Sequence, residues 1–167
     1  MKIDATTRYK DFAIFEPMLD EGEKKRIKEA AVRHRFGKDG FYSMTLGDMF
    51  EVIAGDTRKL TWGVAPDSVF GVYLVQAFAD FIETLIERLK ALTPPSTPDS
   101  VRVSQGCIKR EFDESVYVFC REYFGLGGFA AVERLKVADY IMAKKDAYNK
   151  AIVDRNMAVS IRKGAKA

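Results

Sequence analysis

Residues 68–92, SVFGVYLVQAFADFIETLIERLKAL, decide the fold of this chain. Apolar residues recur there at alternating steps of four and three, which on an α-helix places them along one face. The predicted face consists of Gly71, Val75, Phe78, Ile82, Leu85, Leu89 and Leu92. Polar residues repeat the same steps on roughly the opposite side, so the segment predicts an amphipathic helix. Other parts of the chain, or a partner, must cover its apolar face.

The composition outside this segment predicts a mainly α protein with about five helices. The chain has 167 residues, of which 47% are hydrophobic, and this is enough to bury a core. We expect a single helical domain over residues 1–157 and a basic tail over residues 158–167. Three of the five prolines fall in residues 93–100, so we expect an exposed loop there, between two halves of the domain.

The N-terminal half contains two further helix signals. Residues 20–36 start with acids, end with basic residues and stop at Gly37, which predicts a helix. Residues 45–54 predict a short helix that begins with Thr45 and Asp48 as a capping pair. Residues 1–19 predict an extended arm or short strand that lays aromatic side chains on the core. The side chains expected to face inward from the two helices are Ile27, Ala30, Ala31, Phe36, Leu46, Met49, Phe50 and Ile53.

The C-terminal half predicts two helices after the proline-rich loop. Residues 101–104 alternate as a short strand does, and residues 113–123 have the spacing of a helix. A last helix is expected from residue 129 to at least residue 157. It would be more than about 40 Å long, whereas a compact chain of this size is expected to be about 40 Å wide. Its second half therefore projects, bends or meets another subunit.

The residues that usually carry catalysis or hold metals are scarce. His34 is the only histidine, and neither of the two cysteines lies in a CxxC pair, so we expect no metal and no cofactor. Cys120 could act as a nucleophile with His34 as its base. It lies on the apolar face of a predicted helix, however, where a thiol usually packs as a small hydrophobic group, and we favour this second interpretation. Asp80, Glu83 and Glu87 line one face of the predicted central helix, as carboxylates for acid–base catalysis would. An amphipathic helix needs a polar face in any case, so we favour a solvated face without a catalytic role.

A glycine-rich turn, residues 125–128 (GLGG), precedes the last predicted helix. Free N–H groups at a helix start can hold a phosphate. The alternative, which we favour, is a tight turn between helices that needs a positive φ.

Basic residues are the clearest sign of a functional surface. From residue 133 onward there are nine Lys or Arg and four Asp or Glu, a net charge of +5. A second cluster lies within residues 24–38. Clustered cations neutralise phosphates, so nucleic-acid binding through this basic helix and the tail is an alternative function. The candidate contacts are Lys24, Lys25, Arg26, Lys28, Arg33, Arg35, Arg155, Arg162 and Lys163.

The function that we expect first is non-catalytic assembly or adaptor work through protein contacts, including self-association. The apolar central segment, the aromatic N-terminal residues and the long last helix support it, and a structural component of a larger particle such as a phage or virus is one such setting. The candidate contacts with a partner are Tyr148, Ile152 and Met157. We find no signal peptide and no membrane span, and expect a cytoplasmic protein, or a virion protein if viral.

Overall fold

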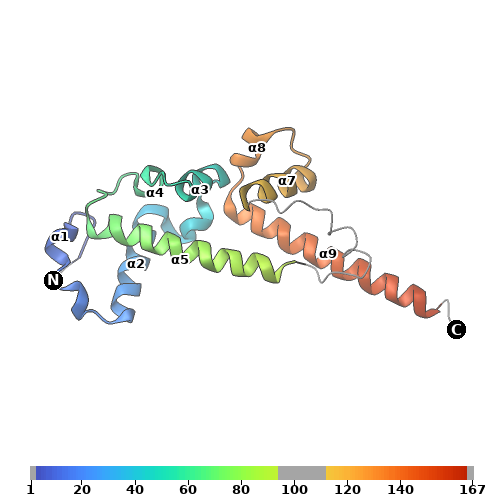
Figure 1. Cartoon of the computed structure of the whole chain (residues 1–167), viewed down its shortest axis with the longest axis horizontal. Helices are drawn as coiled ribbons and strands as arrows, with labels where there is room; N and C mark the ends of the chain where they lie inside the picture. Colours follow the sequence, from blue (N-terminus) through green and yellow to red (C-terminus); the bar gives the residue numbers. More distant parts are fainter. Residues whose placement is uncertain (1–2, 94–111, 165–167) are drawn as a thin grey trace.

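The structure is a computed structural model that describes residues 3–93 and 112–164, with side chains described for residues 3–93 and 114–160. Within these ranges the chain is mainly helical and contains no strand, which confirms the predicted fold class. Figure 1 shows a set of shorter helices gathered around α5 (Val69–Ala91), and α9 (Val137–Gly164) running out to the C-terminus.

Helix α5 begins at the predicted place because Ser68 caps it. The Ser68 side chain accepts a hydrogen bond from the Gly71 N–H at 3.0 Å, which satisfies a donor that the first turn leaves free. The apolar face predicted for α5 is only partly right. Val75, predicted to be covered, is 41% exposed, while Tyr73 and Leu74, which lie outside the predicted face, are fully buried. The neighbouring helices approach α5 from the flank that carries these two residues, and the sequence pattern does not say which flank is covered.

By length and composition α5 could also cross a membrane, but a core helix has the same properties. Within its most apolar window, 44% of the residues are already buried inside this chain. The packing of α5 against α1, α2 and α4 accounts for that burial. Its composition is therefore only weak evidence for a span.

Helix α2 (Glu21–Phe36) packs against α5 and starts with a reciprocal cap. The Glu23 N–H donates to the Asp20 carboxylate at 2.7 Å, and the Asp20 N–H donates to the Glu23 carboxylate at 3.0 Å. Two of its predicted inner residues are buried, but Ala30 is exposed, which corrects that prediction. The 3₁₀ segment η2 (Gly37–Ser43) follows.

The N-terminal segment contains two short helical pieces, so the predicted extended arm or strand is wrong in secondary structure, although it places the aromatic ring of Phe12 in the core as predicted. It contains α1 (Tyr9–Phe12) and the 3₁₀ segment η1 (Glu16–Met18). The Glu16 carboxylate accepts hydrogen bonds from the hydroxyls of Tyr9 and Tyr73, which ties these elements to α5. The predicted strand at residues 101–104 lies outside the described residues.

Helix α3 (Leu46–Ile53) is capped as predicted, since the Thr45 side chain accepts from the Asp48 N–H at 3.1 Å. Ile53, predicted to face inward, is 48% exposed, and Val52 is buried instead. A short helix, α4 (Arg58–Thr61), follows. It packs on both α3 and α5.

The C-terminal half consists of α7 (Phe112–Phe124), α8 (Phe129–Glu133) and α9. The single helix predicted from residue 129 is wrong, because the chain leaves the helical conformation between α8 and α9. There the Leu46 N–H donates to the Leu135 carbonyl at 2.8 Å, and the Val137 N–H donates to the Met44 carbonyl at 2.9 Å. A long-range pairing thus interrupts the helix and joins the two halves of the chain.

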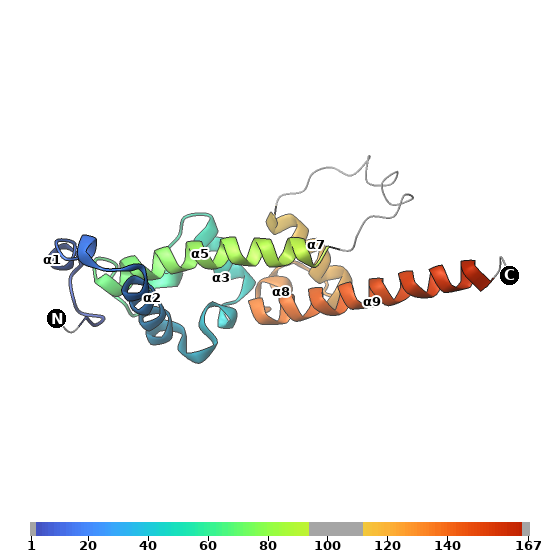
Figure 2. The ribbon, with the colours of Figure 1, turned by 90° about the horizontal axis from the view of Figure 1, so that it is seen from below.

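The distal part of α9 extends away from the other helices, as one of the predicted alternatives states. Figures 1 and 2 show this from two directions. The helix has 28 residues and is therefore about 42 Å long. It continues to Gly164, so the segment predicted as a basic tail is helical as far as the structure describes it.

Candidate functional site

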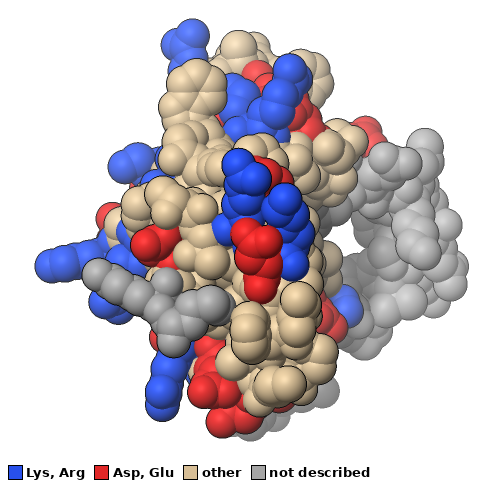
Figure 3. All heavy atoms as spheres, turned by 90° about the vertical axis from the view of Figure 1, so that its left-hand side faces the viewer, with Lys and Arg blue, Asp and Glu red and all other residues tan. Residues whose placement is uncertain are grey.

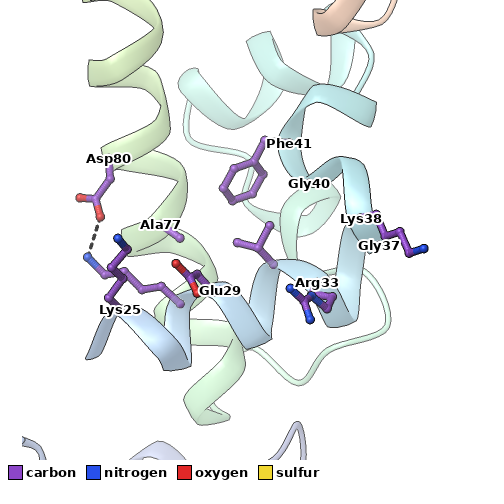
Figure 4. Close-up of a pocket in the computed structure, with 11 residues that line it drawn as sticks. Lys25, Glu29, Arg33, Gly37, Lys38, Gly40, Phe41, Ala77 and Asp80 are labelled. Carbon is purple, nitrogen blue, oxygen red and sulfur yellow. Dashed lines mark hydrogen bonds and ion pairs between the residues drawn. The ribbon is translucent and has the colours of Figure 1, made fainter. Parts of the chain in front are cut away.

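An open groove of about 350 Å³ lies between α2, η2 and α5. Figure 4 shows Phe41 directed into it from η2, with Ala77 on the α5 side, and Val32 lines it from α2. Basic residues of α2 and η2 surround this apolar floor. The groove could therefore accept a small apolar group attached to an anion.

The charges around the groove are partly neutralised. Lys28 forms an ion pair with Asp80 at 2.6 Å. Lys25 and Arg33 have no hydrogen-bond or ion-pair partner among the described residues. Glu29 lies between them on α2 and reduces the positive potential at the centre. The groove thus carries a small excess of positive charge.

The other predicted basic contacts on α2 have different surroundings. Lys24 pairs with Glu21 at 2.9 Å, an exposed contact of small energetic value. Arg35 donates to the backbone carbonyls of Lys59 and Leu60, so it holds α4 against α2. Arg26 is exposed and has no partner within the described part of the chain. Free cations on α2 are therefore fewer than the sequence predicted.

The two basic clusters do not form one surface. Figures 1 and 2 place α2 at one end of the molecule and the C-terminal end of α9 at the other. Figure 3, which looks onto the end with α1 and α2, shows basic and acidic side chains interspersed. Arg155 is exposed on α9, whereas the side chains of Arg162 and Lys163 lie outside the described ones. A nucleic acid would therefore contact one cluster at a time unless it spans the whole molecule.

The predicted partner contacts on α9 lie on two sides of the helix. Tyr148 and Ile152 are half-buried and share one side, one turn apart. Met157 is 56% exposed and lies about 140° round the helix from Ile152. The sequence interpretation missed Val153 and Val159, which are 49% and 46% exposed. The sequence contained a sign of Val159, because apolar residues continue into residues 158–167, where a tail was expected.

Cys120 and His34 do not form a catalytic pair. Cys120 is buried in α7, and its burial raises the pKa of the thiol to about 11. The His34 ring packs edge-on against Phe70, with ring centroids 5.6 Å apart, and Figure 1 shows that α2, which carries His34, is separated from α7. Cys107 lies outside the described residues. A protonated thiol far from the only imidazole is a poor nucleophile.

The structure shows how the acidic side chains and the glycine turn are arranged within the described residues. Within residues 3–93 and 112–164, no three His, Cys, Asp or Glu side chains come close enough to share a metal ion. Gly125 has φ of 65°, so the glycine-rich turn has the positive φ that the packing interpretation requires. It leads into α8, which has only five residues and no side-chain cap.

No protein-family model, no curated protein and no solved structure matches this chain. Its function is therefore inferred from the chemistry and the placement of its own residues.

Proposed function

We propose that this chain is a non-catalytic assembly or adaptor protein that acts by lying against another protein chain. Its contact segment is residues 149–160, called here the distal α9 segment. One observation carries the proposal: every side chain from residue 153 to residue 160 is exposed, although the segment is helical throughout.

A helix in this situation gains little stability from its own backbone. Isolated helices shorter than about 12–15 residues are marginal in water, and most helical stability in proteins comes from packing. The distal α9 segment also exposes three apolar side chains, those of Val153, Met157 and Val159. A partner that covers part of this surface would stabilise the helix and remove apolar area from water.

Photo-crosslinking in the cells that make the protein tests this proposal. Val159 would be replaced by the photoreactive residue benzoylphenylalanine, with Asp154 replaced in the same way as a matched control. Both side chains are exposed on the same segment, but Asp154 lies about 140° round the helix from Val159. We expect discrete adducts with protein from position 159 and none from position 154.

If neither position yields an adduct with a protein, the proposal is wrong. Equal adducts from both positions would mean random collision and would contradict it as well. The mass of a specific adduct would further test the prediction that the partner belongs to a larger particle such as a phage or virus.

Nucleic-acid binding is a second candidate, and the free cations of α2 favour it. Lys25, Arg26 and Arg33 are exposed and lack acidic partners among the described residues. Binding through phosphates would weaken steeply as salt increases. Fluorescence anisotropy with single-stranded and duplex DNA and RNA tests this. Arg33→Glu should weaken binding, while Lys150→Glu, a charge reversal on α9, should not; no binding at low salt would eliminate this candidate.

A further inference from the structure

The distal α9 segment begins a seven-residue repeat. Residues 149–155 read NKAIVDR, and residues 156–162 read NMAVSIR. Both heptads have Asn in the first place, Ala in the third, a β-branched residue in the fourth and Arg in the seventh. Seven residues is the period of a coiled coil, in which the first and fourth places face the neighbouring helix.

The first and fourth places of the repeat form one uncharged stripe. Asn149 and Asn156 occupy the first places and are both exposed. Ile152 and Val159 occupy the fourth places; Ile152 is half-buried, and Val159 is 46% exposed. The charged side chains of Lys150 and Asp154 lie on the other side of the helix, and that of Arg155 flanks the stripe. The surface needed for a coiled-coil seam is therefore available toward the C-terminal end of α9.

We infer that two copies of this chain pair in parallel along the distal α9 segment. Asn149 and Asn156 lie beside their counterparts, and Ile152 and Val159 form the apolar layers between them. This inference rests on the proposed function, for which it names the partner as a second copy.

Asn149 and Asn156 are the reason for choosing a second copy as the partner and a parallel orientation of the two helices. In a parallel pair each Asn meets its own counterpart, so that one amide N–H donates to the other amide oxygen. In an antiparallel pair Asn156 would face an aliphatic side chain, and a buried amide without a partner costs about 1–3 kcal/mol. A second copy supplies Asn at both heights by identity.

The residues that flank the seam are compatible with this arrangement. In a parallel pair the seventh place of the preceding heptad lies beside the fifth place of the neighbouring helix. Tyr148 of one copy then lies beside Val153 of the other, and Arg155 lies beside Ser160. The first contact is apolar and the second joins a cation to a hydroxyl, so no like charges meet.

The size of the seam predicts a weak dimer. Stable complexes usually bury roughly 1,200 Å² or more. The seam has only two heptads, so we expect an association that depends on concentration. Branched residues in the fourth places favour three or four strands, whereas Asn in the first places favours two. The amides pair one to one, and this pairing selects two strands.

Sedimentation equilibrium of the full chain, from about 5 µM to about 500 µM, tests the stoichiometry. We expect a monomer that converts to a dimer. Val159→Glu places a carboxylate in the seam and should weaken the dimer by more than about tenfold. Lys150→Glu is the matched control: it also places a carboxylate at an exposed position of the segment, but it lies about 180° from Val159 round the helix and should leave the dimer unchanged.

Photo-crosslinking from position 159 in a mixture of isotope-labelled and unlabelled copies tests the orientation. In a parallel pair the adduct maps near residue 159 of the other copy, and in an antiparallel pair it maps near residues 149–152. An antiparallel adduct, three or four strands, or equal effects of the two variants would overturn the inference.

The inference and the proposed function can fail separately. A chain that stays monomeric at every concentration, yet gives a cellular adduct with a different protein, overturns the pairing and leaves the proposed function standing. A monomeric chain that gives no adduct in cells overturns both.

Discussion

Phe78 and Val75 test which side of α5 is buried, because the sequence pattern predicts both for the covered face. In the structure Phe78 is 6% exposed, and its ring meets the Phe41 ring edge-on with centroids 5.5 Å apart. Val75, less than one turn away, is 41% exposed. Truncating each side chain to alanine should therefore have very different effects on stability.

The expected magnitudes follow from the burial. Phe78→Ala removes a buried aromatic side chain and should lower the free energy of unfolding by about 3–5 kcal/mol. Domains are stable by only about 5–15 kcal/mol, so this is a large share of the total. Val75→Ala removes two methyl groups that are partly in water, and alanine is the better helix former. We expect a change of less than about 0.5 kcal/mol there.

Urea unfolding followed by circular dichroism measures both effects. If Phe78→Ala does not fold, Phe78→Leu keeps most of the volume and should still cost about 1 kcal/mol. The reasoning is refuted if Val75→Ala destabilises the protein as much as Phe78→Ala does. It is also refuted if both changes are small, since Phe78 would then be exposed in solution.

Three further outcomes are expected. Gly71→Ala should lower the melting temperature, because the added Cβ would lie 2.4 Å from the Ala65 carbonyl oxygen. Gly127→Ala is the control and should leave the melting temperature unchanged, since a Cβ there would have nothing within 4 Å. Equal melting temperatures of the two variants would contradict this packing. The free energy of unfolding measured in urea should not change near neutral pH and should fall as the pH rises from about 9 to about 11. Burial raises the pKa of Cys120 to about 11, so the thiol of the unfolded chain loses its proton at a lower pH than the thiol of the folded chain. A free energy of unfolding that increases over this interval would contradict the prediction. Deleting residues 156–167 should leave the urea midpoint unchanged and weaken association, since the described side chains removed are exposed; an unfolded truncation would show that the deleted residues support the core.

The sequence predicted the starts of three helices because short-range contacts set them. Ser68, Thr45 and Asp20 each accept a hydrogen bond from an N–H three residues later. Such a cap depends only on residue type and spacing, so it can be inferred without knowing the rest of the fold. The mainly α class followed from the same local signals together with the apolar periodicity.

The break between α8 and α9 could not be predicted in this way. No proline or glycine marks residues 134–136, and their composition suits a helix. Pairing of this segment with Met44 and Leu46 decides their conformation. Helix propensity amounts to a few tenths of a kcal/mol per residue, which long-range hydrogen bonds and packing readily exceed.

The candidate surfaces divide in the same manner. The sequence showed where cations are numerous, but only the tertiary structure decided which are free: Lys28 meets Asp80 on α5, and Arg35 binds backbone carbonyls of α4. It likewise showed that the last helix is longer than the body needs. That the heptads fall on its exposed part was decided by how the two halves dock.

By itself, the sequence determined that the chain is helical, where its capped helices start and that its last helix outgrows a compact body. The tertiary structure alone decided which flank of α5 is buried, where the C-terminal helix is interrupted and which charges remain unpaired. The physical reason is range: caps and periodicity act within a few residues, whereas burial and ion pairing depend on segments that the fold brings together from far apart in the chain.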